Sequence, residues 1–367
     1  MKIALLDPGL VTTQGHHFDL DLRLARALAR LGHDVEVHGF VNPDQRLSAA
    51  AQAMGMALRS TFRVPPYIAL PQTQSPLQAY EQMAAATAED LAQVTGSDLW
   101  VWPTFTPYQF AAAQTEDGRV RQLGGLWWTP RFPHGIGARS WAHTERRLMQ
   151  GKSLITVGAY DQAICRAYKS FSPGLDVVCL PCPHDGVDND QRPPVLRRIG
   201  FFGHQRVSRG LELIPGLVRA LVQRGFDVVV QDSSRSIQGE PKHPNVEVLE
   251  YVPDFAAEIA RCDLVIWPSR WEAYVENFSG VMAECVATGV PIVAPSGCLP
   301  AEVLARFGCN SFFHEFSLEA IIEAVDLAEM EFPAVVARAQ AAARLWRAEN
   351  GTDRLAAWIV AHAGEAL

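Results

Sequence analysis

The segment from Pro268 to Pro295 constrains the fold more than any other part of the sequence. Residues 265–267 (Val-Ile-Trp) form a short apolar run that ends at a proline, which is typical of a buried strand. Ser279 is a good helix N-cap and Gly289 a good C-terminal stop, so the residues between them are predicted to be helical. Residues 291–295 (Pro-Ile-Val-Ala-Pro) then form a second strand. Strand, loop, helix and strand in this order indicate an α/β fold.

The start of this predicted helix has the features of an anion site. Ser279 and Gly280 are small, so the backbone N–H groups at the helix N-terminus stay open to a ligand. Glu276 lies in the loop before the helix and Glu284 inside it. The amides suit a diphosphate, Glu284 a ribose diol and Glu276 sugar hydroxyls. The same pattern also fits a capped helix with both glutamates on a solvated face.

The segment resembles the C-terminal signature of retaining GT-B glycosyltransferases of family 4, in which two glutamates have seven residues between them. Glu276 and Glu284 have that spacing, and residues 287–291 (Ala-Thr-Gly-Val-Pro) resemble the ending that follows it. The resemblance implies two Rossmann-like domains with parallel sheets that face an interdomain cleft. It implies retaining transfer of a sugar from a nucleoside diphosphate donor, with Glu276 as a catalytic residue. The implied donor contacts in this segment are Glu276, Asn277, Phe278, Ser279, Gly280 and Glu284.

Both halves of the chain open in the same way. Residues 2–6 read as a buried strand, and the leucines of residues 20–31 follow a helical period before a second strand begins at residues 34–37. Residues 198–203 open a second sheet that also leads through a loop into a helix. A strand, a glycine-containing loop, a helix and a strand are the opening of a Rossmann-like sheet.

The domain boundaries are predicted from composition. Residues 1–187 are assigned to an N-terminal, acceptor-side domain and residues 195–350 to a nucleotide-sugar-binding domain. Between them, residues 188–194 are polar and proline-containing, as expected of a linker. A helix over residues 352–364 is expected to cross back onto the first domain, as the last helix does in GT-B proteins. Residues 42–96 are expected to be mostly helical.

Composition fits an ordinary globular enzyme. At 367 residues the chain is long enough for two domains, and its 48% apolar and 20% charged residues are typical of globular proteins. The net charge of −8 argues against general nucleic-acid binding. No apolar run approaches the roughly 20 residues that span a bilayer. The scattered cysteines and the absence of a signal-peptide pattern favour the cytoplasm.

A basic loop follows the first strand of the second half. Residues 203–210 (Gly-His-Gln-Arg-Val-Ser-Arg-Gly) resemble the basic pair of the same glycosyltransferases. Arg209 stands in the place of the family's lysine, and Arg206 substitutes for its arginine because His204 occupies the expected position. Two cations here would stabilise the charge that develops on a departing diphosphate, without a metal ion. Surface arginines at a helix start are the alternative interpretation.

The first loop of the chain is also a candidate contact. Residues 14–17 (Gln-Gly-His-His) resemble the glycine-rich loop that approaches the donor phosphates and the acceptor in this family. Gly15 is therefore a predicted donor contact. His16 and His17 are predicted acceptor contacts, with ordinary loop histidines as an equal alternative.

Two further loops complete the prediction. A strand is expected at residues 125–128, and Thr129 and His134 in the loop after it are candidate acceptor contacts, since ligands gather at the carboxyl ends of parallel strands. The donor base is expected near Tyr251 and Val252.

No cofactor or metal is predicted. The GxGxxG pattern of dinucleotide sites is missing. Residues 188–190 (Asp-Asn-Asp) match a DxD triplet but lie in the linker, and Cys179 and Cys182 form a lone CxxC pair. The expected partners are a nucleotide sugar and a glycan, lipid-linked or small-molecule acceptor.

One basic window differs from the rest of this acidic chain. Between Arg119 and Lys152 there are seven Lys and Arg residues against one Glu, with three tryptophans interleaved. This composition fits peripheral contact with the inner membrane face or with an anionic acceptor, and it also fits a solvated basic helix.

Two other functions fit parts of the pattern. A GT-B sugar-nucleotide epimerase would need carboxylates from the first domain. A catalytically silent subunit that binds a nucleotide sugar or a glycan has no chemical need for Glu276, Glu284 and Arg209 together.

Overall fold

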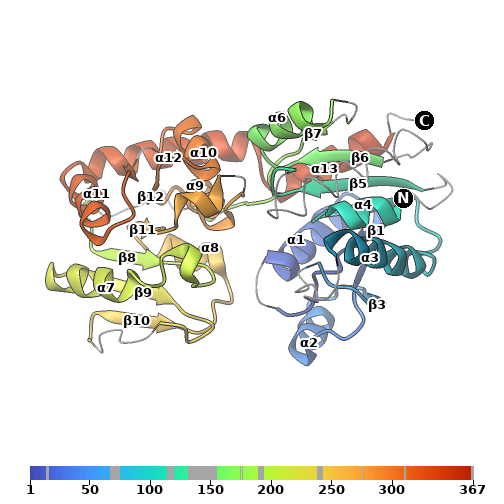
Figure 1. The fold of residues 1–367 in the computed structure, drawn as a ribbon, viewed down its shortest axis with the longest axis horizontal. Coiled ribbons are helices and arrows are strands. Elements are labelled where there is room, and N and C mark those ends of the chain that lie inside the picture. Colours follow the sequence, from blue (N-terminus) through green and yellow to red (C-terminus); the bar gives the residue numbers. More distant parts are fainter. Residues whose placement is uncertain are drawn as a thin grey trace. The chain divides into compact units, whose positions relative to one another are not determined.

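The chain folds into two compact units. The computed structural model describes residues 1–13, 16–66, 75–113, 120–130, 155–173, 175, 177–188, 194–237, 243–275, 277–309 and 311–364. The first unit contains residues 1–183 together with residues 351–367, and the second contains residues 184–350 (Figure 1).

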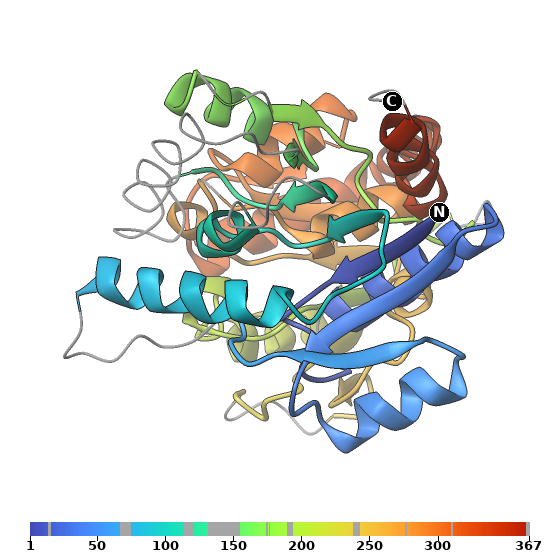
Figure 2. The ribbon, with the colours of Figure 1, turned by 90° about the vertical axis from the view of Figure 1, so that its right-hand side faces the viewer.

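The first unit is built on a parallel sheet whose strands lie side by side in Figure 2. The described strands are, in order across the sheet, β3 (Leu58–Phe62), β2 (Asp34–Phe40), β1 (Lys2–Leu6), β4 (Leu99–Trp102), β5 (Arg121–Leu126), β6 (Ile155–Ala159) and β7 (Val177–Cys179). Every adjacent pair is parallel. The central strand β4 is buried along its whole length, as expected of a parallel strand covered on both faces.

The helices of the first unit include one from the end of the chain. The described helices are α1 (His16–Arg30), α2 (Gln45–Ala53), α3 (Pro76–Leu91), α4 (Pro107–Ala113), α6 (Gln162–Phe171) and α13 (Thr352–Gly364). Helix α13 packs on α1. Arg30 of α1 forms an ion pair with Asp353, and Arg23 Nη1 donates a hydrogen bond to Thr352 Oγ1 at 3.2 Å. Residues 352–364 therefore complete the first unit.

The second unit repeats the plan with a second parallel sheet. Its described strands, in order across the sheet, are β10 (Val246–Leu249), β9 (Asp227–Gln231), β8 (Arg198–Phe201), β11 (Leu264–Ile266), β12 (Ile292–Pro295) and β13 (Ser311–Phe313). Every adjacent pair is parallel here as well.

Helices cover both faces of this second sheet (Figure 1). They are the short 3₁₀ helices η1 (Val207–Arg209) and η2 (Trp271–Tyr274), and the α-helices α7 (Ile214–Gln223), α8 (Phe255–Ala260), α9 (Gly280–Thr288), α10 (Leu299–Arg306), α11 (Leu318–Met330) and α12 (Phe332–Glu349). Helix α7 packs with α11, and α9 packs with α8, α10 and α12. In the part of the chain that the structure describes, no helix has the length and apolar character required to cross a membrane.

Helix α9 has the boundaries that its sequence signals predict. The Ser279 side chain caps its N-terminus by accepting a hydrogen bond from the Met282 amide at 3.3 Å. Gly289 ends it with a φ of 73°, a left-handed conformation that glycine adopts without strain. The two strands predicted on either side of the helix are β11 and β12.

The chain enters the second unit a few residues earlier than predicted. Residues 184–187, which composition assigns to the first domain, belong to the second unit. Gly186 lies so close to α9 that a Cβ there would be 2.3 Å from the carbonyl carbon of Ala287. The Trp346 indole on α12 donates a hydrogen bond to the His184 carbonyl oxygen at 2.8 Å. These contacts hold the segment on α9 and α12.

Candidate functional site

Two loops meet where the strand order of the second sheet reverses. Strand β8 lies between β9 and β11, so the loops that follow β8 and β11 lie at the topological switch point, where open parallel sheets bind ligands. The loops contact each other directly. The Arg270 amide donates a hydrogen bond to the Ser208 carbonyl oxygen at 3.1 Å. A Cβ on Gly210 would lie 2.1 Å from the Pro268 carbonyl oxygen, so only glycine permits this approach.

The two predicted arginines converge on one buried tyrosine. Arg209 Nε donates a hydrogen bond to Tyr274 Oη at 2.8 Å, and Arg206 Nη2 lies 3.4 Å from the same oxygen. Tyr274 is only 1% exposed, and its ring packs edge-on against Trp267 with 4.6 Å between the ring centroids. The structure therefore brings both cations to one point in the switch-point loops.

Arg209 is held against the backbone of the loop after β8. A Cβ on Gly203 would lie 1.8 Å from Arg209 Nη1, so the guanidinium group occupies the space that a side chain would fill. The Gly203 amide is itself fixed by a 2.7 Å hydrogen bond to Gln231 Oε1. Arg209 Nη1 is buried and has no hydrogen-bond partner among the residues that the structure describes. Because a buried donor without a partner is costly, an anion at this point would be favourable.

His204 lies in the same loop, and the positive charge of the two arginines affects its pKa. Burial lowers the pKa of His204, and the positive charges of Arg206 and Arg209 lower it further. Ser234 Oγ lies 3.2 Å from the His204 ring nitrogen Nδ1. A neutral imidazole beside two guanidinium groups adds no third charge to the site.

Glu284 is buried and engages a histidine. It is 4% exposed, and its Oε2 atom lies 2.7 Å from His184 Nδ1. The alternative of a solvated face is therefore wrong for Glu284, because α9 is buried along almost its whole length. The His184 ring also lies at the start of α9, since a Cβ on Gly280 would be 3.5 Å from its Cε1 atom. The predicted contact of Glu284 with a ribose stays a prediction.

The remaining predicted donor residues are spread along the same unit. Asn277 and Phe278 lie between η2 and α9, and the Phe278 side chain is buried. Tyr251 and Val252 follow β10, which is the edge strand in the order β10-β9-β8. Tyr251 is 54% exposed.

Several predictions lie outside the described residues. They concern Gly15, Glu276 and His134, together with most of the basic window from Arg119 to Lys152. His16 is described only as the first residue of α1. These roles stay predictions.

In the first unit, the loop after β1 contains a buried polar cluster. His17 is 6% exposed, and its Nδ1 atom donates a hydrogen bond to Asp7 Oδ2 at 2.6 Å. Asp7 Oδ1 accepts a hydrogen bond from the Gly9 amide at 2.7 Å. Burial raises the pKa of Asp21 well above its ordinary value, and the neighbouring Asp7 raises it further. Through its hydrogen bond to Asp7, His17 holds the loop on the sheet. Thr129, the other described acceptor candidate, is also buried.

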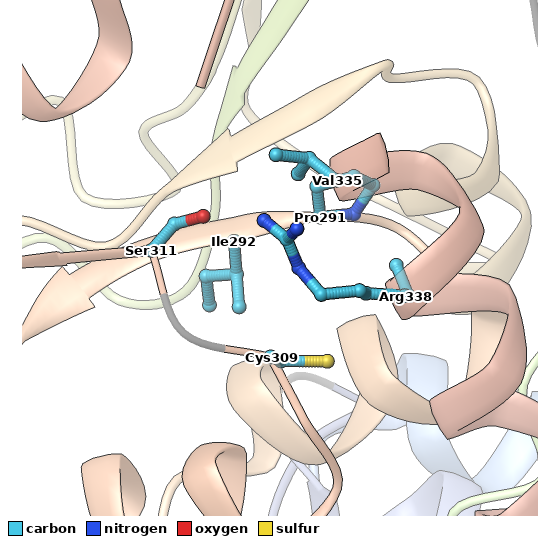
Figure 3. A pocket seen from close by; sticks show the side chains of 7 residues that line it. Pro291, Ile292, Cys309, Ser311, Val335 and Arg338 are labelled. Atoms are coloured by element: carbon cyan, nitrogen blue, oxygen red, sulfur yellow. The ribbon is translucent and has the colours of Figure 1, made fainter. Parts of the chain in front are cut away.

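A small pocket elsewhere in the second unit contains none of these residues (Figure 3). It lies beside β12, β13 and α12, and its lining residues are Pro291, Ile292, Cys309, Ser311, Val335, Arg338 and Ala339. Burial raises the pKa of the Cys309 thiol to about 11, although Arg338 partly opposes the effect. This mostly apolar pocket has no arrangement of groups for catalysis. Within the described ranges, no set of three or more His, Cys, Asp and Glu side chains is placed to hold a metal ion.

A comparison with known protein families matches the part of the chain that contains the switch-point loops. Residues 197–329 match the family described as Glycosyl transferases group 1. No curated protein matches the sequence. Among solved structures, HepE of Anabaena in complex with UDP has a TM-score of 0.69 at 14% identity, with 99% of each chain covered. A glycosyltransferase from Rickettsia africae has a TM-score of 0.68 at 13% identity, covering 99% of this chain and 98% of that chain.

SnogD from Streptomyces nogalater, also a glycosyltransferase, has a TM-score of 0.61 at 19% identity, covering 98% of this chain and 99% of that chain. These likenesses show that the chain has the GT-B fold, which confirms the predicted fold class. Together with the family match of residues 197–329, they support a GT-B glycosyltransferase.

Proposed function

We propose that the protein is a retaining glycosyltransferase that moves a sugar from a nucleoside diphosphate donor to a hydroxyl acceptor without a metal ion. The observation that carries the proposal is the convergence of Arg206 and Arg209 on Tyr274 at the switch point of the second sheet. The family match of residues 197–329 contains this site. The UDP complex of the similarly folded HepE supports a nucleoside diphosphate donor.

Arg206 and Arg209 would bind the diphosphate and stabilise its departure. Arg209 Nη1, which is buried without a partner within the described chain, would donate to a phosphate oxygen. As the bond between the sugar carbon and the bridging oxygen breaks, negative charge grows on the diphosphate. Guanidinium groups that are already in place stabilise that charge without reorganising.

Other groups would bind the rest of the donor and the acceptor. The N-terminus of α9 would contribute amides to the diphosphate, with Glu284 near the ribose and Glu276 near the sugar. The acceptor oxygen would bond to the sugar carbon from the side that the diphosphate leaves. Its proton would pass to the departing phosphate oxygen. No protein nucleophile is required for this step, and the acceptor is a glycan, a lipid-linked molecule or a small molecule.

Calorimetry tests the donor site directly. Wild-type protein would be titrated in EDTA with UDP, dTDP, GDP and ADP. The melting temperature provides a second readout, because a ligand that binds only the folded protein raises it. We expect one of them to bind, and Arg209→Ala to weaken that binding. Arg224, which forms an ion pair with Asp326 at 3.4 Å elsewhere in the second unit, provides the control Arg224→Ala. Absence of binding by the wild-type protein to all of these nucleotides would overturn the proposal.

Product analysis tests the reaction. With the matched nucleotide sugar and a panel of hydroxyl acceptors, we expect release of nucleoside diphosphate and a product whose anomeric configuration equals that of the donor. Proton NMR of the anomeric position distinguishes this from inversion, which would contradict the retaining mechanism. Binding without any turnover would instead identify a silent subunit, and a changed sugar on the nucleotide would identify an epimerase.

A further inference from the structure

We infer that Tyr274 is the positioning residue of this diphosphate site. Its phenol oxygen holds Arg206 and Arg209 in the orientation in which both guanidinium groups bind one anion. This inference rests on the proposed function, and it concerns a residue outside the pair of glutamates and the basic loop that indicate that function. Tyr274 itself does not need to touch the substrate.

The hydrogen bonds of Tyr274 use its whole capacity to accept. A phenol oxygen accepts up to two hydrogen bonds and donates one. One acceptor position is occupied by Arg209 Nε at 2.8 Å and the other by Arg206 Nη2 at 3.4 Å. Two cations repel each other, so a shared acceptor is needed to keep both near one point before the anion arrives.

The Tyr274 ring is held in place by Trp267. Its ring packs edge-on against Trp267, which directly follows β11 and is fully buried. On either side of Tyr274, the side chains of Trp271 and Val275 are exposed, so this short segment turns only the tyrosine ring inward. Trp267 thus fixes the Tyr274 ring next to the sheet, and Tyr274 in turn fixes the side chains of Arg206 and Arg209.

This geometry leaves one donor nitrogen of Arg209 without a partner in the described part of the chain. Its Nε atom is committed to Tyr274, while Nη1 is buried against Gly203 and has no hydrogen-bond partner in the described part of the chain. The guanidinium group is planar, so fixing Nε also fixes the plane in which the two Nη atoms donate. Ordering the side chain before binding removes an entropic cost from the binding step.

A purely structural role for Tyr274 makes a different prediction. In that case loss of the phenol oxygen would lower stability and leave ligand binding unchanged. Tyr274→Phe keeps the ring and its contact with Trp267 and removes only the oxygen. Tyr80→Phe is the matched control, because Tyr80 is also buried, in the first unit, and its hydroxyl donates to the Pro107 carbonyl oxygen at 3.0 Å.

The experiment measures binding of inorganic pyrophosphate and of whichever of UDP, dTDP, GDP and ADP the wild type binds, by calorimetry in EDTA, with melting temperatures measured in parallel. We expect Tyr274→Phe to weaken both ligands roughly tenfold, the effect of one lost hydrogen bond to a charged group. Pyrophosphate is included because it has neither base nor ribose, so an equal loss for both ligands locates the effect at the phosphates. Tyr80→Phe should lower the melting temperature and bind both ligands as the wild type does. Unchanged binding by Tyr274→Phe would overturn the inference.

A double-mutant cycle identifies the arginines as the intermediary. If Tyr274 acts through the arginines, Tyr274→Phe should weaken binding less in an Arg209→Ala background than in the wild type, because coupled residues are not additive. Fully additive losses would overturn the inference and leave the proposed function standing. If the wild-type protein binds none of UDP, dTDP, GDP and ADP, the proposed function falls, and the inference falls with it.

Discussion

Replacing Gly203 with alanine tests whether the position of Arg209 matters for binding. Gly203 has a φ of 95°, and a Cβ there would lie 1.8 Å from Arg209 Nη1. Ordinary contact begins near 3.4 Å, so the guanidinium nitrogen would have to move by about 1.6 Å. A shift of this size would break the 2.8 Å hydrogen bond from Arg209 Nε to Tyr274.

Two separate costs follow from this substitution. An alanine in the left-handed region costs about 1–2 kcal/mol of folding stability. Loss of a hydrogen bond between Arg209 and a phosphate costs about 1.5–3 kcal/mol of binding free energy. We therefore expect Gly203→Ala to weaken nucleoside diphosphate binding by about 10- to 100-fold.

Gly225→Ala separates the two costs. Gly225 lies in the same unit at a φ of 90°, and a Cβ there would meet no atom within 4 Å. Gly203→Ala should lose at least as much stability as Gly225→Ala in thermal unfolding, while calorimetry should show weakened binding for Gly203→Ala alone. Equal binding by Gly203→Ala and the wild type would refute the reasoning, because Arg209 would then be displaced without effect.

Three other predictions test separate parts of the structure. Glu284→Ala should weaken nucleoside diphosphate binding by about 1–3 kcal/mol in calorimetry, and it should also lower stability because His184 Nδ1 loses its 2.7 Å partner. Asp21→Asn should raise the melting temperature at pH 7, with a gain that shrinks towards pH 4. The pKa of Asp21 in the folded protein is raised above its usual value of 3.8, mainly by burial and also by Asp7. The stability that protonated Asp21 contributes below pH 3.8 is therefore lost as the pH rises through the raised pKa. Transferase activity should survive excess EDTA, and loss that manganese or magnesium restores would contradict the metal-independent mechanism.

The second half of the fold was predictable where its signals are local. Helix α9 begins and ends at the residues that its cap and its glycine indicate, because both signals act within a few residues of the helix end. The arginines of the basic loop were also found from their local pattern. Tyr274 was not, because its partners Arg206 and Arg209 are 68 and 65 residues away in the chain. His184 was missed for the same reason.

The first half shows how packing overrides local propensity. Strand β5 (Arg121–Leu126) begins before the expected strand at residues 125–128, because Gly124 and Gly125 obscure its pattern. Both glycines are required by neighbours: a Cβ would lie 2.1 Å from the Phe105 ring and 2.3 Å from Tyr160 Oη respectively. Strand β3 lies within residues 42–96, which were expected to be mostly helical. Arg59 and Ser60 in this edge strand are exposed and polar, so the sequence has no apolar run there.

The discontinuity of the first unit has a consequence for how the protein is made. Helix α13 packs on α1, although residues 352–364 are synthesised only after the whole second unit. The second unit is continuous in sequence, so it contains all of its own elements without residues 351–364, whereas the first unit lacks a helix until they are present. The apolar surface of α1 that α13 covers stays open to chaperones, or to aggregation, until translation has passed residue 364. A released chain that ends at residue 350 should therefore contain a protease-resistant second unit beside a protease-sensitive first one.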